Sequence, residues 1–187
     1  MYVGIAILLD DRAAKTARKL MRELDAGYGT GLTFSHLVQH VSLKQSFPYD
    51  GDLKELENYF RELFSQLEPF EICIEKIEAR QLDGKAIVWL KVRESAQLRA
   101  LHERLCTELR DHFGVMPLGY DGVEWQFHST IAIADVADDA MKQIMDRYHD
   151  RELHLEFTAR KAVVFCSMNM NPESFLCFKP KRFSIGR

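Results

Sequence analysis

Two stretches of this 187-residue chain pair a histidine with a hydroxyl residue two positions later. In the first, His40 is followed by Ser42, and in the second, His128 is followed by Thr130. Both stretches lie in runs of strand-forming residues, and successive side chains of a strand point to opposite faces. Each histidine is therefore predicted to share one face of its strand with its hydroxyl partner. The apolar neighbours are predicted to face a core.

Paired imidazoles and hydroxyls suit chemistry at a phosphoester. Opening a cyclic phosphodiester requires one group that takes a proton from the nucleophile and another that gives a proton to the leaving oxygen. Histidine, with an ordinary pKa of about 6.5, can fill either role near neutrality. Hydroxyls can hold the non-bridging oxygens, and the scheme needs no metal. The sequence does not say which histidine is the acid and which is the base.

Other side chains near the motifs are weaker candidates for substrate contact. Lys44 is predicted to lie on the face of His40 and could place positive charge near a phosphate, although a solvated lysine at a strand end is the favoured interpretation. A basic group could also come from the carboxyl-terminal run, namely Lys179, Lys181 or Arg182. Tyr120 and Trp125, just before the second motif, could stack on a base, although packing in the core or at its rim is favoured.

The motifs must be positioned by an alternation of strands and helices. Alternating and short apolar runs predict strands over 2–9, 37–47, 86–92, 125–134, 153–158, 162–167 and 175–178. A further strand is predicted to begin at Phe70 and to lead into a turn at 82–85, from which the strand of 86–92 returns. Apolar residues at helical spacing, with capping residues ahead of three of the runs, predict helices whose apolar positions span 13–24, 53–67, 98–109 and 141–148. The third helix is predicted to begin after Ser95 and to end near Gly114. The order of motif strand, helix, strand, strand therefore occurs twice.

The two tetrapeptides, His-Val-Ser-Leu at 40–43 and His-Ser-Thr-Ile at 128–131, resemble the twin signature of the 2H phosphoesterase superfamily. That superfamily includes the bacterial 2'-5' RNA ligase and cyclic phosphodiesterase proteins. The resemblance implies an α+β fold of two pseudo-symmetric α/β lobes, whose antiparallel sheets face a central cleft lined by the motifs. It also implies that the two histidines are general acid and base and that Ser42 and Thr130 contact phosphate. Ser42 stands where threonine is common, and Ser129 where an apolar residue is usual.

We expect one bilobal domain over residues 1–187. The first motif is expected within lobe elements of 34–114 and the second within lobe elements of 123–180. The strand and helix of 2–25 are expected to pack on the sheets. The loop of 115–124, with its proline and glycines, divides the halves.

Composition limits the partners. A net charge of -3 and a pI near 6.2 argue against broad binding to duplex nucleic acid, but leave a nucleotide or an RNA end as substrate. The apolar first nine residues are too short for a signal peptide or a membrane span. Four cysteines without a CxxC pair favour reduced, buried thiols and a cytoplasmic location.

We expect neither a metal nor a cofactor. His36 and His40 are four residues apart, but no carboxylate or cysteine completes a ligand set with them. The remaining histidines are expected on helices or their ends, exposed beside charged residues: His102, His112, His149 and His154.

The sequence therefore predicts a metal-independent phosphoesterase. Its expected substrate is a 2',3'-cyclic phosphate, or a related 2'-linked phosphodiester, of an RNA end or nucleotide. Hydrolysis is preferred because water is always available, whereas ligation must also hold a second RNA strand. Two alternatives remain at this point: 2'-5' RNA ligation, and a non-catalytic module that binds a nucleotide or RNA end.

Overall fold

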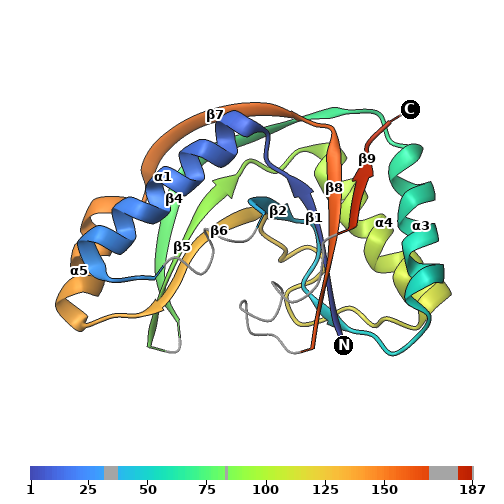
Figure 1. Ribbon diagram of the computed structural model, residues 1–187, viewed down its shortest axis with the longest axis horizontal. Helices are drawn as coiled ribbons and strands as arrows, with labels where there is room; N and C mark the ends of the chain where they lie inside the picture. The colour runs from blue at the N-terminus through green and yellow to red at the C-terminus, as the bar shows by residue number, and fades with distance from the viewer. Residues whose placement is uncertain (32–37, 83, 169–180, 187) are drawn as a thin grey trace.

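The structure, a computed structural model, describes residues 1–31, 38–82, 84–168 and 181–186. This part of the chain contains two antiparallel sheets and four helices. In Figure 1, α1 and α5 lie at one end of the molecule, and α3 and α4 lie at the other. No helix among the described residues is long and apolar enough to cross a membrane. The α+β class and the antiparallel sheets agree with the fold predicted from the sequence.

The first sheet, sheet A, carries the first motif at its edge. Its strands run in the order β2-β1-β8-β9, and a further short strand, β3, also pairs with β1. Their bounds are β1 Tyr2–Leu8, β2 His40–Ser42, β3 Phe47–Pro48, β8 Lys161–Ser167 and β9 Lys181–Ser184. Helix α3 (Leu53–Ser65) contacts β9. Its apolar stripe is buried, as predicted for a helix packed on a sheet.

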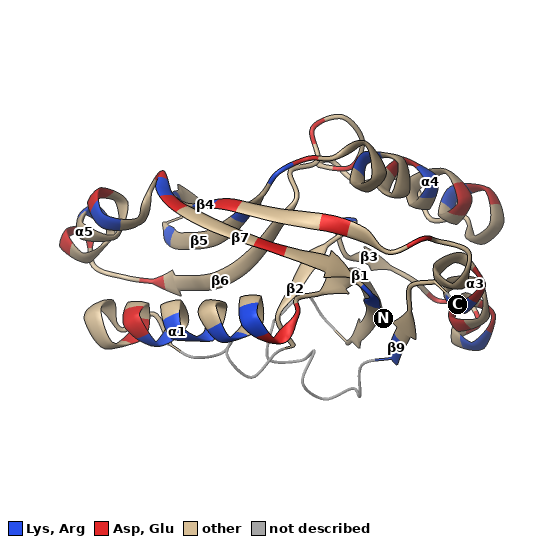
Figure 2. Cartoon of the chain, turned by 90° about the horizontal axis from the view of Figure 1, so that it is seen from above, with Lys and Arg blue, Asp and Glu red and all other residues tan. Residues whose placement is uncertain are grey.

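The second sheet, sheet B, carries the second motif at its edge. Its strands run in the order β6-β5-β4-β7. Their bounds are β4 Phe70–Leu82, β5 Lys85–Val92, β6 His128–Asp135 and β7 Arg151–Ala159. Helix α1 (Asp11–Tyr28) contacts β6 and β7, and α5 (Asp138–Tyr148) contacts β4 and β5. Figure 2 shows these two helices from above.

Sheet membership does not follow the order of the chain. The β4–β5 hairpin, expected beside the first motif, pairs with the second motif strand β6. Conversely, β8 follows the second motif in sequence but pairs with β1 in the sheet of the first motif. Periodicity marks where strands are, but not which distant strand each one pairs with.

Capping residues fix the helix ends. Asp10 begins α1 by accepting a hydrogen bond from Ala13 N at 2.8 Å, and Ser95 begins α4 (Ala96–Phe113) in the same way. The first helix is longer than predicted, because it continues through Gly27 and ends at Gly29, which has φ 65°. Gly114 ends α4 in the same left-handed conformation.

Two expectations for the motif strand and the basic run need correction. The predicted first motif strand is two short strands, β2 and β3, separated by residues 43–46. The carboxyl-terminal basic run is partly strand, because Lys181 and Arg182 lie in β9 and pair with β8. The predicted strand 175–178, Lys179 and His36 lie outside the described residues.

A β-bulge changes the face assignment in β6. The register of β5 and β6 shifts by one residue between the pairs Val88–Ala132 and Trp89–Thr130. Ile131 and Ala132 are both buried as a result, and Ile133, expected on the core face, is 38% exposed. The alternation of buried and exposed side chains therefore holds from His128 to Thr130 and fails from the bulge onward.

Candidate active site

The first motif occupies the edge of sheet A. Val41 pairs with Ile7 and is fully buried, as is Leu43. His40 and Ser42 point to the other face, where they remain partly exposed. The His40 ring packs against Phe165 of β8, with ring centroids 4.7 Å apart. This is the arrangement that alternation predicted for the motif.

The second motif has the same arrangement at the edge of sheet B. Phe127 and Ser129 are buried, and His128 and Thr130 lie partly exposed on the other face. The unusual serine at 129 therefore does not open this strand to solvent. The His128 ring lies beside Trp89 of β5, with centroids 4.9 Å apart.

Both histidines are held in the same way. Nδ1 of His40 lies 2.7 Å from the carbonyl oxygen of Val38, and Nδ1 of His128 lies 2.7 Å from that of Gln126. A carbonyl oxygen only accepts hydrogen bonds, so each Nδ1 carries the proton and each neutral ring keeps its lone pair at Nε2. Neither Nε2 has a hydrogen-bond partner among the described residues. Each Nε2 lone pair is the ring's proton acceptor.

The two motif strands meet where the sheets adjoin. β2 and β6 are edge strands of different sheets, and they contact each other. Burial lowers the pKa of His40 to about 4; the Val38 carbonyl raises it, and the nearby His128 lowers it further. Burial also lowers the pKa of His128, against the effect of the Gln126 carbonyl. Both free imidazoles are thus neutral at pH 7.

A buried carboxylate organises the face beside His128. Glu78 is 5% exposed and accepts a hydrogen bond from Trp89 Nε1 at 3.0 Å. It also pairs with Arg80 at 3.1 Å and Lys91 at 3.2 Å. Arg80 in turn lies over the Trp89 ring, 4.5 Å from its centroid. The sequence analysis missed this group, although polar residues alternate with apolar ones along the hairpin.

A pocket of about 510 Å³ opens beside His128. Tyr120 and Trp125, the aromatic candidates from the sequence, both line it, together with Trp89 and Arg80. Tyr120 is 64% exposed, whereas Trp125 is 7% exposed. Trp125 also packs in the core, because its ring stacks on His102 at 5.5 Å. The wall of this pocket is thus aromatic, with a cation at its edge.

Lys44 is not a solvated lysine, so the favoured interpretation of this residue is wrong. Its ammonium forms an ion pair with Asp121, and both side chains are 0% exposed. Asp121 also accepts hydrogen bonds from the backbone N–H groups of Leu118 at 2.8 Å and Gln45 at 3.2 Å. Lys44 therefore connects the end of the first motif to the loop before the second.

His102 makes a second connection between the same segments. It was expected to be exposed but is fully buried. Its Nδ1 lies 2.8 Å from the carbonyl oxygen of Leu43, and its Nε2 accepts a hydrogen bond from Gly122 N at 2.8 Å. Burial is the main cause of its lowered pKa. His112, His149 and His154 are exposed as predicted, but His154 lies within β7 and not on a helix or at a helix end.

One cluster has metal-ligand residue types. His102, Cys106 and Asp121 each place a ligand-type atom within 4.8 Å of the others. However, both ring nitrogens of His102 are hydrogen-bonded, and the Asp121 carboxylate holds Lys44 and two backbone N–H groups. We interpret the cluster as a structural network between the motifs.

The fold and the paired motifs define a protein of the 2H phosphoesterase type. The chain belongs to the 2'-5' RNA ligase superfamily, whose family model matches residues 9–166. No curated protein sequence matches the chain.

Solved structures share the whole fold at low sequence identity. TT0787 of Thermus thermophilus is 15% identical with a TM-score of 0.69, and the match covers 99% of this chain and 98% of that one. E. coli LigT complexed with NADP+ is 14% identical with a TM-score of 0.55, over 99% and 97%. LigT complexed with 3'-AMP is 13% identical with a TM-score of 0.54, over 99% and 98%.

Proposed function

We propose that this protein is a metal-independent phosphoesterase that opens a 2',3'-cyclic phosphate, or a related 2'-linked phosphodiester, at an RNA end or on a nucleotide. The observation that carries the proposal is the pair of edge strands in contact. Each presents a histidine with its lone pair at Nε2 and a hydroxyl on the same face. Family membership and the nucleotide complexes of the LigT structures support a nucleotide-type substrate.

In the proposed reaction, Nε2 of one histidine accepts a proton from water as the water oxygen bonds to phosphorus. The bond from phosphorus to the ribose 2' or 3' oxygen then breaks. The other histidine, protonated on both nitrogens, gives its Nε2 proton to the leaving oxygen. The product is a ribose monophosphate. Each positioned acid or base contributes about 10² to 10⁴ in rate.

Binding of the substrate phosphate is proposed to protonate the histidine that acts as the general acid. Both imidazoles are neutral in the free protein, because burial disfavours their charged forms. A phosphate anion between the rings favours the protonated form and raises the pKa of the acid. The hydroxyls of Ser42 and Thr130 are proposed to donate hydrogen bonds to the non-bridging oxygens.

The aromatic pocket beside His128 is the proposed position of a base. Trp89, Tyr120 and Trp125 offer ring faces, and stacking of a base on such a side chain contributes about 1–3 kcal/mol. Lys44 is not among the proposed phosphate contacts, because its ammonium is buried with Asp121. Its proposed role is to position the first motif, through the buried ion pair with Asp121.

Ligation of RNA ends through a 2'-5' bond is the second candidate. The name of the family favours it. The same two histidines serve this reaction in the same roles: one accepts the proton of a ribose 5' hydroxyl, which replaces water as the nucleophile at phosphorus, and the other protonates the 3' oxygen that leaves. A module that binds the same ligands without turnover is the non-enzymatic alternative.

The test is turnover of the four nucleoside 2',3'-cyclic phosphates, and of a short RNA with a cyclic phosphate end, in the presence of EDTA. Wild-type protein is compared with His40→Ala and His128→Ala, and His112→Ala is the control because that histidine is exposed on α4. We expect both motif variants to lose at least about 10²-fold in kcat. Activity should survive chelation.

Each alternative result has a definite meaning. Loss of activity in EDTA contradicts the two-histidine mechanism. Joining of RNA ends that outpaces hydrolysis favours the ligase. Binding through both histidines without turnover favours the binding module.

A further inference from the structure

A second pocket, of about 360 Å³, lies beside the first motif. Its lining includes Leu8 and Val38, and Val38 is the residue whose carbonyl oxygen holds His40. Four basic side chains from three elements and their flanks also line it: Arg18, Arg160, Lys161 and Arg182. Asp10 and Asp11 are its acidic lining residues. The pocket is therefore basic and adjoins a histidine of the proposed active site.

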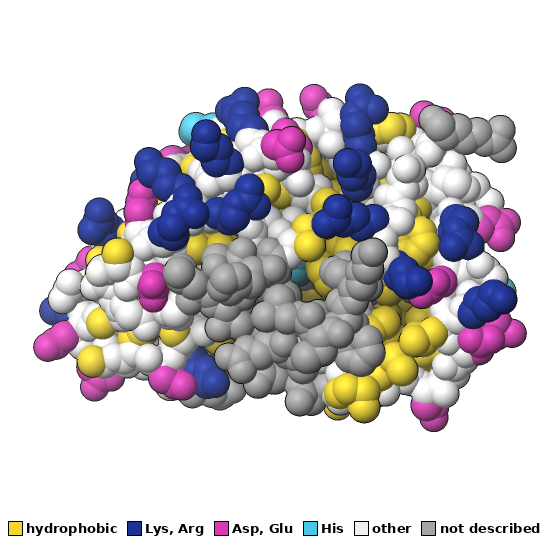
Figure 3. Space-filling model, viewed as in Figure 1, with side chains coloured by type: hydrophobic (Ala, Val, Ile, Leu, Met, Phe, Trp, Pro, Cys, Tyr) yellow, Lys and Arg dark blue, Asp and Glu magenta, His cyan; other side chains and the backbone are white. Residues whose placement is uncertain are grey.

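The four basic side chains outnumber the two acidic ones that line the pocket. Within the described part of the chain, none of them forms an ion pair, whereas the neighbouring Lys181 pairs with Glu57 of α3 at 3.4 Å. Asp10 is occupied in capping α1. Unpaired cations around one hollow are notable in a chain whose net charge is -3. Figure 3 shows Lys and Arg side chains gathered over α1 and over β8 and β9.

Strand register places this pocket relative to His40. His40 pairs with Leu8 on one side of β1, and Ile7 pairs with Ala162 on the other side. Lys161 therefore lies two strands from His40, roughly 10 Å across the sheet.

A second row of paired residues crosses sheet A from β2 through β1 and β8 to β9. Ser42 pairs with Ala6, Ala6 with Val163, and Val163 with Arg182. These rows share one face, as the packing of Ala6 and Val163 in a single cluster shows. Arg182 thus lies on the face of the first motif, three strands from Ser42.

We infer that this basic pocket binds a second phosphate of the substrate, so that the preferred substrate is an oligonucleotide with a reactive phosphate at its end and not an isolated nucleotide. The inference rests on the proposed function for the position of the reacting phosphate. With that phosphate at His40, the next phosphates of the strand lead across sheet A towards Lys161 and Arg182. Unpaired cations at that distance bind a phosphate backbone without reading its sequence.

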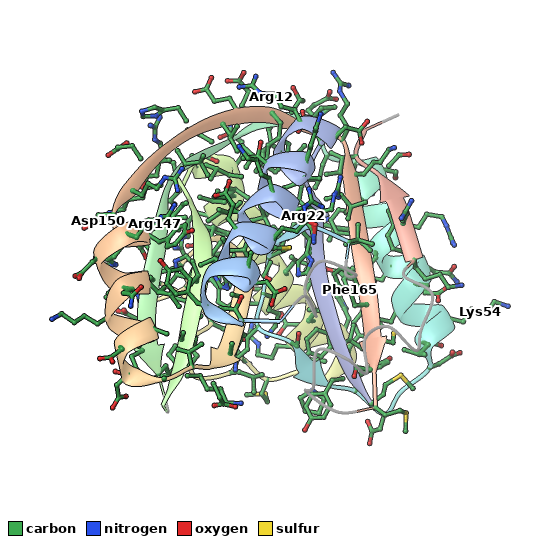
Figure 4. All side chains as sticks on the ribbon, turned by 60° about the vertical axis from the view of Figure 1, so that its left-hand side comes forward. Arg12, Arg22, Lys54, Arg147, Asp150 and Phe165 are labelled. Carbon is green, nitrogen blue, oxygen red and sulfur yellow. The ribbon has the colours of Figure 1, made fainter. Side chains whose placement is uncertain are left out.

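The experiment compares two double variants that each remove two positive charges. Lys161→Gln/Arg182→Gln removes charge from the pocket. Lys54→Gln/Lys142→Gln is the control, because both lysines are exposed on helices and neither lines the pocket. Lys54 projects from α3 at the edge of the molecule, away from Phe165 (Figure 4).

The probes are uridine 2',3'-cyclic phosphate and a trinucleotide with the same cyclic end, plus a fluorescent oligouridylate for binding. We expect the pocket variant to lose about tenfold in selectivity for the trinucleotide over the mononucleotide. Its oligouridylate affinity should depend less on salt, with a log–log slope smaller by about 0.7, because one single-strand phosphate contact contributes about 0.7. The control variant should keep the wild-type selectivity and slope.

Equal selectivity and equal salt slopes in the two double variants would overturn the inference. Failure of the proposed function is a different result: neither cyclic substrate is turned over, while oligouridylate binding still reports on the pocket. Melting curves check that the variants are folded. Arg18→Gln provides a second variant from α1, and it should lower oligouridylate affinity in the same direction.

Discussion

The motif histidines are held alike, although their strands belong to different sheets. In each case Nδ1 meets the carbonyl oxygen of the residue two positions earlier, at 2.7 Å. That bond fixes both the tautomer and the ring orientation before any substrate arrives. The two rings therefore lose their rotational freedom during folding, and less entropy is lost when acid, base and phosphate are aligned on binding. The motif supplied the residue types, but the carbonyl partners became evident only from the structure.

Single-residue changes to the hydroxyls test their proposed contact with phosphate. Ser42→Ala and Thr130→Ala should each lower kcat on a 2',3'-cyclic phosphate by about 10²-fold, because each removes one donor to the developing charge. Thr130→Ser keeps the hydroxyl and should retain most of the activity. If Thr130→Ser falls as far as Thr130→Ala, the methyl group and its packing matter instead of the hydroxyl.

At the scale of elements, buried polar contacts join the two motifs. The end of β2 meets the loop before β6 through the Lys44–Asp121 pair and through His102 of α4. This connection could not be predicted, because Lys44 and Asp121 are 77 positions apart. Locally, Lys44 has the appearance of any lysine at the end of a strand. Helix ends, by contrast, depend on nearby capping residues, and the sequence located most of them within a few positions.

Removing one partner of the buried pair tests this connection. Lys44→Met should lower the free energy of unfolding by about 3–5 kcal/mol, because it leaves the Asp121 carboxylate buried without a counter-charge. Lys44→Met/Asp121→Asn removes that charge but keeps an oxygen for one of the two backbone donors, which bond different oxygens of Asp121, and it should recover part of the loss. Urea unfolding measures both variants. A double variant no more stable than the single one would show that lost packing, and not the uncompensated charge, causes the effect.

At the scale of the molecule, the sequence predicted the class of fold and the faces of both motifs, but not the pairing of the sheets. The hairpin β4–β5 brings Glu78, Arg80 and Trp89 to His128 because it pairs with β6, which lies far along the chain. Phe165 reaches His40 for the same reason, through β8 and β1. The residues next to such a side chain in the sequence do not indicate which site it will line, because that depends on the pairing of distant strands.

Three histidines whose pKa values are lowered in the folded protein should also make the whole fold sensitive to acid. Burial lowers the folded-state pKa of His40, to about 4, and lowers those of His102 and His128. In the unfolded chain each returns to about 6.5, so below that pH the unfolded state binds more protons than the folded state. Stability from these groups is therefore complete above about pH 7 and is lost as pH falls through 6.5 towards the folded pKa values.

We expect the free energy of unfolding to fall between pH 7 and pH 5, by up to about 2 kcal/mol for each histidine that stays neutral in the folded protein. Urea unfolding at a series of pH values measures the slope. His102→Gln should be less stable at every pH, because it disturbs the bonds to Leu43 and Gly122, but its slope should be shallower because one titrating group is gone. An unchanged slope in His102→Gln would mean that His102 takes up its proton without unfolding, which would contradict its role as a neutral, buried connection between the motifs.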